Sequence, residues 1–418
     1  MSSRAIRLTE RSIESWCGPF WETRRAQSTD KGVRICILTV GRVAFSTPHY
    51  HKEAAALKAA GHDVSVIAPC GEMEDVNDPT LNYLRIEVIP LVRGNFDSRF
   101  RKLLALPRLY RLARRVACDA YQVMEVPSLA VGVALKLATG RRLVYDCRED
   151  YPRALAVNTG LPVLSALLVP LFTAFENLLV LATDRCFVVS EALLDRFIRL
   201  GRPTSLLLNL PRLDFASGAT HRGKYGRPFE FIYTGFPEER VAMEEMIEGL
   251  GLARGLGANA RLTFLGTSPD HPRATTCTAI ARRLGIEGDV RFLPEVGYLD
   301  VPKLLSAADA GLIVYRANDY TRRFAHSVKM FEYMAVGLPV VCSDFPNLVR
   351  PIQEAGCGLL VDPGNPESIA LAMVMLVTHP DEARRMGRNA RHAFVTKFNW
   401  EATEGAYVSA MEKLAKRP

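Results

Sequence analysis

The chain has 418 residues, which is too long for one ordinary hydrophobic core, so two domains are expected. Hydrophobic residues make up 48% of it and charged residues 23%, a composition that excludes fibrous and disordered proteins. The net charge is +8, and nine scattered cysteines without a CxxC pair argue against a disulfide framework and indicate a reducing compartment.

No stretch reaches the roughly 18 uninterrupted apolar residues of a membrane span. The nearest approach, residues 161–175, is broken by Pro170 and followed by Glu176, so we expect a helix packed within a domain. An alternative stays open, in which this helix dips into a bilayer interface. Residues 1–30 lack the apolar core of a signal peptide and are expected to form an extension outside the fold.

The first half alternates short apolar strands with helices. A strand at 33–39 is followed by a loop with Gly41 and Arg42, a helix at 49–60 and a strand at 63–68. Such units form parallel sheets that bind ligands at the carboxyl ends of their strands, which places Gly41 and Arg42 near a cleft. The GxGxxG pattern is absent, so this half is a poor dinucleotide site. Further strands are expected at 120–125, 142–146, 185–190 and 205–208, and helices at 128–138, 161–181 and 190–200.

A basic amphipathic stretch interrupts this rhythm at residues 98–116. Leucines give it an apolar face, and Pro107 is expected to divide it into two helices. This pattern is typical of contact with an anionic membrane surface, while a solvated helix face on a basic protein is the competing interpretation. Nucleic acid is not expected as a partner, because no recognition motif accompanies the cations. The cations are Arg99, Arg101, Lys102, Arg108, Arg111, Arg114 and Arg115.

The second half repeats the alternation after a polar, glycine-containing segment at 212–227, which is the best candidate linker. Two doubly wound α/β domains that face each other across a cleft are the expected architecture. Strands are predicted at 229–234, 261–265, 290–293, 310–315 and 358–361, and helices at 241–254, 272–284, 301–307, 366–378, 381–397 and 399–416.

Residues 326–345 combine an apolar helix, Gly337 as its terminator and a short apolar strand that Pro339 begins or precedes. Lys329 and Glu332 lie three residues apart, on one side of this helix. Charges in such surroundings are costly unless they are paired or bind something. Two interpretations remain open: an ion pair on a solvated edge, or a ligand site where the helix amides and a lysine meet phosphates.

From about Lys31 onward the chain resembles the family 4 glycosyltransferases of the GT-B fold, the glycosyl transferases group 1 type. In the first domain the resemblance lies in EAAAL at 53–57, GHDV at 61–64 and VYDCRE at 144–149. In the second it lies in YTG at 233–235, AADAGL at 307–312, KMFEYMA at 329–335, GLPVV at 337–341, EAGCGLLVD at 354–362 and FNW at 398–400.

The resemblance implies two Rossmann-like domains with distinct tasks. Residues 31–211 would form the acceptor-side domain and residues 228–398 the nucleotide-sugar-binding domain, with residues 212–227 as the linker. Residues 399–418 would form a C-terminal helix that crosses back to the first domain.

It also implies roles for single residues. Glu332 would bind the ribose hydroxyls of the donor, because a carboxylate can accept from two adjacent hydroxyls. Arg240 and Lys329 would neutralise the leaving diphosphate. Retention of anomeric configuration, no metal, no cofactor and a UDP- or GDP-linked donor are expected. The implied donor-binding residues are Gly235, Gly266, Ser327, Val328 and Glu332.

The sequence departs from the family pattern at three places. The first glutamate of the donor motif falls at Phe324, so it is missing or displaced to Asp319. Arg148 replaces a family histidine; it cannot act as a base but could clamp a phosphate or a sugar. Thr47-Pro48-His49 replaces aspartate–x–arginine, which leaves His49 as an acceptor-side group or a helix cap. The acceptor-side or sugar-contacting candidates are Gly41, Arg42, His49, Arg148, Glu149 and Asp319.

The function expected from these features is a retaining, metal-independent glycosyltransferase of cell-surface polysaccharide or glycolipid biosynthesis. It would act on a glycan or lipid-linked acceptor, in the cytoplasm or peripherally on the inner face of the cell membrane. Two alternatives are a GT-B nucleotide-sugar epimerase, for which Glu149 and Asp150 would have to supply the acid and base, and a catalytically weak partner subunit that binds nucleotide sugars.

Overall fold

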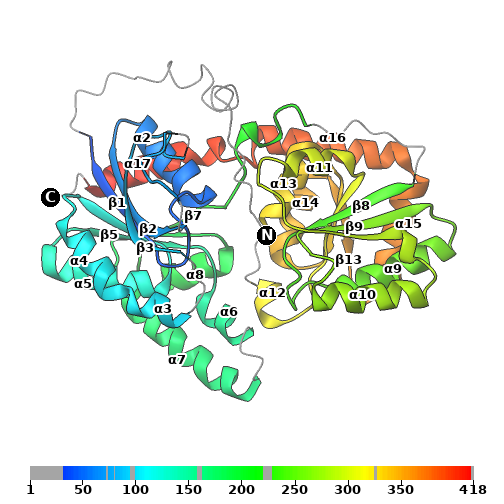
Figure 1. The fold of residues 1–418 in the computed structure, drawn as a ribbon, viewed down its shortest axis with the longest axis horizontal. Helices are drawn as coiled ribbons and strands as arrows, with labels where there is room; N and C mark the ends of the chain where they lie inside the picture. Colours follow the sequence, from blue (N-terminus) through cyan, green and yellow to red (C-terminus); the bar gives the residue numbers. More distant parts are fainter. Residues whose placement is uncertain are drawn as a thin grey trace. The chain divides into compact units, whose positions relative to one another are not determined.

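A computed structural model of the chain describes residues 32–71, 74–79, 81–94, 99–157, 162–219, 228–323 and 327–415 (Figure 1). The N-terminal stretch 1–30, residues 220–227 of the predicted linker and Phe324 lie outside these described residues. The chain divides into two compact units. One comprises the chain up to Leu208 and from Thr403 onward, and the other is Asn209–Ala402.

The first unit is built on a seven-stranded sheet in the order β3-β2-β1-β4-β5-β6-β7, in which every pair is parallel. Its central strands are buried on both faces, as parallel sheets covered by helices require; all four residues of Ala120–Val123 are buried. The strands are β1 (Arg34–Leu38), β2 (Asp63–Cys70), β3 (Glu87–Arg93), β4 (Ala120–Val123), β5 (Arg142–Cys147), β6 (Arg185–Val188) and β7 (Thr204–Leu206).

Helices cover both faces of this sheet (Figure 1). The C-terminal helix packs onto it, since the Tyr407 hydroxyl donates to Gln122 Oε1 at 2.7 Å and its ring lies 5.3 Å from that of Phe187. The helices are the π-helix η2 (Thr47–Ala54), α2 (Ala55–Ala59), α3 (Arg99–Leu104), α4 (Leu106–Arg115), α5 (Val126–Thr139), α6 (Tyr151–Val157), α7 (Pro162–Val180), α8 (Glu191–Arg199) and α17 (Glu401–Ala415).

The second unit contains a six-stranded parallel sheet in the order β10-β9-β8-β11-β12-β13, again between layers of helices (Figure 1). Its strands are β8 (Phe229–Thr234), β9 (Ala260–Leu265), β10 (Val290–Leu293), β11 (Ala310–Ile313), β12 (Val340–Ser343) and β13 (Gly358–Val361). Its helices are the 3₁₀ turns η3 (Leu213–Ala216) and η4 (Glu287–Asp289), then α9 (Met243–Gly255), α10 (Pro272–Arg283), α11 (Val301–Ala307), α12 (Asp319–Arg323), α13 (Val328–Val336), α14 (Pro346–Ala355), α15 (Pro366–Thr378) and α16 (Pro380–Thr396).

The predicted pair of Rossmann-like α/β domains is confirmed, but β3, α6, α12, α14 and the two 3₁₀ turns were not predicted. Strand β3 contains Pro90, which reads as a breaker and is tolerated because β3 lies at the edge of the sheet. Helix α12 occupies a segment predicted to be a loop. Helix α14 begins with Pro346 and contains Pro351, so its prolines obscure the helical pattern there.

The basic stretch forms two helices as predicted. They divide at Ala105, and Pro107 lies in the first turn of α4, where its missing N–H costs nothing. Among the described helices, none combines the length and apolar character that crossing a membrane would require.

Candidate functional site

Helix α13 begins at the carboxyl edge of the second sheet. Ser327 precedes its first residue, Val328, and the Ser327 Oγ lies 3.4 Å from the Tyr315 hydroxyl beyond the end of β11. Gly337 ends the helix in the left-handed conformation, with φ +84°, and Pro339 precedes β12, both as predicted. The first amides of such a helix have no intrahelical acceptors and carry a partial positive charge, so this end favours an anion.

Tyr333 fixes α13 against two strands. Its hydroxyl oxygen accepts a hydrogen bond from the Thr234 amide at 3.0 Å and donates to the Leu312 carbonyl at 3.3 Å. Its ring lies against Gly311, where a Cβ would come within 2.2 Å of the ring. The start of the helix is therefore held in a defined place relative to the ends of β8 and β11.

Lys329 extends from the first turn of α13 across the end of β8. Its Nζ lies 5.5 Å from the centre of the Tyr233 ring. A Cβ on Gly235 would come within 2.4 Å of the lysine Cε, so a glycine is needed for this close approach. Within the described part of the chain no ion pair joins Lys329 to Glu332, which does not support the ion-pair interpretation of their spacing.

Arg240 lies in the loop between β8 and α9, and backbone contacts with the segment after β11 fix its position. Its carbonyl accepts from the Arg316 amide at 2.7 Å, and the next residue, Val241, forms an antiparallel bridge with Tyr315. These contacts tie the loop to the segment that leaves β11. The backbone of Arg240 is therefore positioned at the same sheet edge as α13.

The guanidinium of Arg240 is surrounded by aromatic rings and one carboxylate. It forms an ion pair with Glu238, donates to the Tyr320 hydroxyl at 3.3 Å and lies 5.8 Å from the centre of the Tyr315 ring. Burial by itself would lower the pKa of Arg240, but Tyr320 and Glu238 outweigh it, so the pKa is raised and the charge is permanent. A half-buried cation held this rigidly is suited to binding an anion.

Two glycines lie at the strand ends beside these cations. Gly235 (φ +129°) and Gly266 (φ +95°) follow β8 and β9, and a Cβ on Gly266 would lie 3.0 Å from the Gly235 carbonyl oxygen. A cavity of about 430 Å³ borders Gly266, and Glu238 and Glu295 are among the other residues that line it. The amides of Gly235 and Gly266 donate to the carbonyls of Leu265 and Leu293 at 2.7 and 2.9 Å, so these glycines allow a close backbone approach at the strand ends.

Glu332 is half-buried on α13, one turn beyond Lys329. It lies near Tyr298, whose pKa is raised first by burial and then by the negative charge of Glu332. The centre of the Tyr298 ring in turn lies 5.1 Å from that of the Phe215 ring of η3, with the ring planes tilted by 43°. A carboxylate in this position can accept hydrogen bonds from a pair of hydroxyls.

Asp319 is the first residue of α12, and its carboxylate forms an ion pair with the Arg323 Nε at 3.3 Å. Both side chains are more than 60% exposed, so the pair contributes little to stability. Phe324, where the missing motif glutamate would fall, lies outside the described residues.

The predicted residues of the first unit also gather at the carboxyl edge of their sheet. The amides of Gly41 and Arg42 both donate to the Thr39 Oγ1 at 3.2 Å, and Thr39 donates to the Glu125 Oε1 at 2.6 Å. The charge of Arg42 is close enough to lower the pKa of Arg148, although burial contributes more to that shift. Arg42 is therefore near the buried cluster described next.

Arg148 is buried and already paired with carboxylates of the protein. It forms ion pairs with Glu53 and, at 2.6 Å, with Asp146; burial and Arg42 lower its pKa to about 9, so it stays protonated at neutral pH. Glu53 accepts from the Gln122 amide at 2.7 Å. The predicted sugar or phosphate clamp thus has its charge neutralised internally. The neighbouring Glu149 is half-buried, and its carbonyl accepts from the Cys147 thiol at 3.2 Å.

Comparisons with known proteins identify the family. Residues 221–393 match the description "Glycosyl transferases group 1", and residues 47–211 match "Glycosyl transferase 4-like domain". The chain belongs to the group 1 glycosyltransferases of the GT-B fold.

Individual relatives are distant. The chain is 26% identical over 250 residues to the D-inositol 3-phosphate glycosyltransferase of Saccharomonospora viridis, covering 55% of this chain and 56% of that protein. It is 24% identical over 241 residues to the GDP-mannose:cellobiosyl-diphosphopolyprenol alpha-mannosyltransferase of Xanthomonas oryzae, covering 57% and 60%. The chain thus spans little more than half the length of these curated relatives. Its fold is similar to that of Anabaena HepE, solved in complex with UDP and glucose (TM-score 0.68, 15% identity, 91% of this chain and 100% of that one).

In this group 1 family member, His49 is fully buried in η2. Its Nε2 lies 3.0 Å from the Ala44 carbonyl, so Nε2 must carry the proton, and its Nδ1 accepts from the Ser46 hydroxyl at 3.0 Å. Burial lowers its pKa to about 3, assisted by Arg42. Both ring nitrogens form hydrogen bonds with residues just before the helix, Ala44 and Ser46, which favours the capping interpretation of His49.

His49 is expected to make the first unit less stable at acidic pH. Its folded-state pKa is about 3, whereas the unfolded value is about 6.5, so between these values only the unfolded state binds the proton. Stability attributable to this group falls as pH drops below about 6.5, by about 2 kcal/mol at pH 5. Hydrogen exchange of β1 and β4 at pH 7.5 and pH 5 should show this loss in the native chain and not in His49→Gln. The control His392→Gln, on α16, should behave like the native chain; an equal loss in His49→Gln would contradict the prediction.

The sequence did not predict the residues that surround Arg240 in this glycosyltransferase-family chain. Glu238, two residues earlier, could have been noticed as an acid in the same polar loop. Tyr320 is 80 positions away and gives no local signal.

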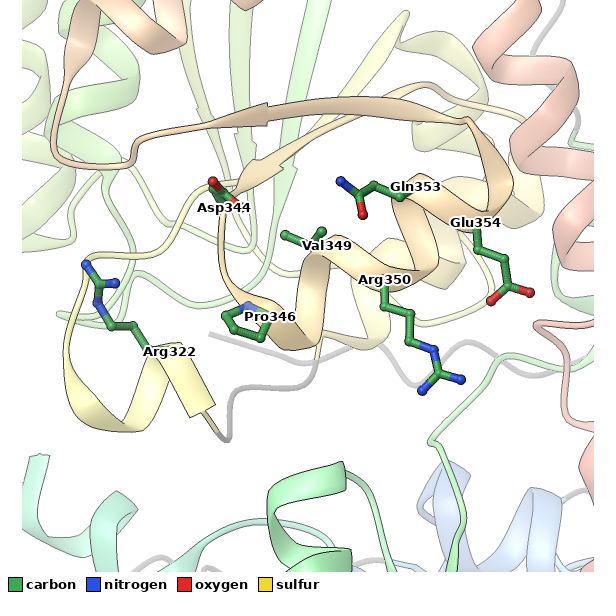
Figure 2. A pocket seen from close by; sticks show the side chains of 7 residues that line it. All are labelled: Arg322, Asp344, Pro346, Val349, Arg350, Gln353 and Glu354. Atoms are coloured by element: carbon green, nitrogen blue, oxygen red, sulfur yellow. The ribbon is translucent and has the colours of Figure 1, made fainter.

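A second cavity of the same unit, of about 720 Å³, lies between α12 and α14 (Figure 2). Figure 2 shows Asp344 at the end of β12, with Arg322 on α12 and Arg350 on α14 to either side. Arg322 also lies over the Phe345 ring at 5.5 Å. The lining carries two arginines and two acids, so its charges balance and it does not select an anion; it includes none of the predicted donor residues.

Proposed function

We propose that this protein transfers a sugar from a nucleotide-sugar donor to a glycan or lipid-linked acceptor. The donor would be UDP- or GDP-linked, the anomeric configuration would be retained, and neither a metal nor a cofactor would be required. The protein would act peripherally at the cytoplasmic face of the membrane, in the synthesis of cell-surface polysaccharide or glycolipid.

One observation carries the donor assignment: two cations and a helix N-terminus meet at one edge of the second sheet. Lys329 lies over Tyr233 beside Gly235, Arg240 is held in the loop that follows β8, and α13 starts next to Tyr315 beyond the end of β11. This arrangement suits a diphosphate, whose negative charge rises as the sugar leaves. Glu332, one turn along α13, would then receive the ribose hydroxyls.

The reaction needs no further charged group at the donor side. The bond between the anomeric carbon and the diphosphate oxygen breaks, a bond to the acceptor oxygen forms, and the acceptor proton passes to the departing diphosphate. Lys329 and Arg240 would stabilise the charge on that leaving group, so a dedicated carboxylate nucleophile is not expected.

Relatives support the choice of substrates. HepE was solved with UDP and glucose, and the Xanthomonas relative is named for GDP-mannose and a diphosphopolyprenol-linked acceptor. The cationic helices α3 and α4 in the unit proposed to receive the acceptor would suit an anionic membrane surface.

A transfer assay tests the proposal. The purified protein is incubated with radiolabelled UDP- and GDP-sugars and a membrane lipid extract, and the label in the lipid fraction is counted. Transfer that is lost in Glu332→Ala supports the proposal. Interconversion of the sugar without an acceptor would indicate an epimerase, and binding without turnover would indicate a partner subunit; either result contradicts it.

Glu238→Gln is expected to raise the affinity for UDP or GDP. The Glu238 carboxylate is paired with Arg240, so a diphosphate must displace it to reach the guanidinium. Removing that charge should strengthen binding by about 2- to 10-fold, and more at low salt, because the competing pair is partly exposed. Glu239→Gln, an exposed neighbour, is the control for isothermal titration and should change little. Weaker binding in Glu238→Gln would show that Glu238 assists the donor instead.

A further inference from the structure

Helix α7 of the first unit exposes a long apolar face to solvent. Leu171, Phe175 and Leu178 follow one another at helical spacing and are 63%, 47% and 66% exposed. Side chains of this size normally face a core, and a stripe of them on a solvated helix marks an interaction surface.

The exposed face of α7 carries no charge. The helix has a single ionisable residue, Glu176, which is fully buried and paired with Arg196 of α8 at 2.7 Å. Its remaining oxygen accepts from the Tyr145 hydroxyl at 2.7 Å. The one carboxylate that would repel an anionic surface is therefore turned into the unit and neutralised there.

Cationic helices lie on the same face of the sheet as α7, with α5 between α4 and α7. Helix α5 packs against both α4 and α7, and α3 packs against α4. Right-handed crossovers place α4, α5 and α7 on the same face of the sheet, because β3, β4, β5 and β6 follow one direction across it (Figure 1). Helices α3 and α4 together carry seven arginines and lysines and no acid.

Apolar side chains continue onto α3. Phe100, Leu103 and Leu104 are each more than half exposed, and they flank the cations Arg101 and Lys102. Large apolar residues interleaved with cations are typical of helices that lie in the interface of an anionic membrane. A second copy of this chain is the less suitable occupant, because it would bring two sets of the same cations together.

We propose that α7 inserts Leu171, Phe175 and Leu178 into the interfacial layer of an anionic bilayer while α3 and α4 hold its head groups. This inference deepens the proposed function, from which it takes the membrane as the site of action. It assigns the penetrating role to a helix outside the basic stretch, and so provides the second, apolar signal that stable membrane attachment needs.

The experiment measures sedimentation with vesicles of phosphatidylglycerol and phosphatidylcholine, with pure phosphatidylcholine for comparison, at about 0.1 M and about 1 M salt. Salt at 1 M screens the cations but not apolar burial. We expect native protein to bind the anionic vesicles and to retain part of this binding at 1 M salt. The double variant Phe175→Asn and Leu178→Asn should lower the vesicle binding that remains at 1 M salt by about tenfold or more. The triple variant Arg111→Glu, Arg114→Glu and Arg115→Glu should mainly lower the vesicle binding that is seen at about 0.1 M salt and lost at about 1 M salt.

The control variant, Leu256→Asn with Leu371→Asn, removes leucines of similar exposure from the second unit and should bind as the native chain does. The variant Phe175→Trp gives a second readout that does not weaken the apolar face. Its tryptophan fluorescence in excess of that of the native chain should be quenched by vesicles with brominated acyl chains. The proposal is overturned if the asparagine variant still binds vesicles at 1 M salt as the native chain does, or if the added tryptophan is not quenched. It is also overturned if the protein forms dimers through this face of α7 in the absence of vesicles. Vesicle binding is measured without a nucleotide-sugar donor. A protein that does not bind vesicles can therefore be told apart from one that does not transfer sugar.

Discussion

Lys329→Met is expected to lower kcat/KM for sugar transfer by about 10²- to 10³-fold, the effect of removing one preorganised group from a developing negative charge. Lys329 projects from the first turn of α13 over Tyr233 and forms no ion pair within the described residues, so its charge is available to a ligand. Methionine keeps a similar length and apolar stem, which isolates the loss of charge. Initial rates over a range of donor concentrations measure the effect.

Lys303→Met provides the control, because Lys303 is exposed on α11 of the same unit. It should retain native kinetics. Because Lys329 is assigned to the diphosphate, the methionine variant should lose affinity for UDP or GDP while its weak affinity for the free nucleoside stays unchanged. Equal losses for nucleoside and diphosphate would place Lys329 elsewhere in the site.

Gly235→Ala is expected to reduce transfer by a similar factor for a different reason. The new methyl would come within 2.4 Å of the Lys329 Cε and 2.8 Å of its Nζ, so the lysine must leave its position. The backbone at φ +129° is also one that alanine rarely adopts, which costs about 1–3 kcal/mol. Both activity and thermal stability should fall.

Gly257→Ala separates these two effects. Gly257 has φ +90°, but a Cβ at this position would meet no other atom within 4 Å, so its replacement strains the backbone without touching the site. It should lose stability and keep native kcat/KM. Full activity in Gly235→Ala would show that the position of Lys329 is not needed for transfer.

The fold could be predicted because its signals are local. Short apolar strands, helices of regular period and glycines such as Gly337 and Gly61 at helix ends repeat along the chain, and each is visible within a few residues. The alternation of strand and helix then fixes parallel sheets. Where a proline stood inside an element, as in β3 and α14, the local signal was misleading and the element was missed.

The surroundings of the site residues could not be predicted, because they depend on contacts between distant segments. Nothing near Arg148 in the sequence shows that Glu53 neutralises it, and nothing near Arg240 points to Tyr320. His49 was a candidate on position alone, and its burial became visible only once η2 was folded against the sheet. Residue type and spacing therefore located α13 and its charges, whereas pairing and burial had to come from the structure.

The most direct test of the donor site is isothermal titration of UDP and GDP into the native chain, Arg240→Ala, Glu332→Ala and the control Lys303→Met. We expect one of the two nucleotides to bind the native chain and Lys303→Met with equal affinity, at one site per chain. Arg240→Ala and Glu332→Ala should each weaken that binding by about 100-fold or more, since each removes a charged hydrogen-bonding group. Native affinity in both variants, or no binding of either nucleotide to the native chain, would contradict the assignment of the site.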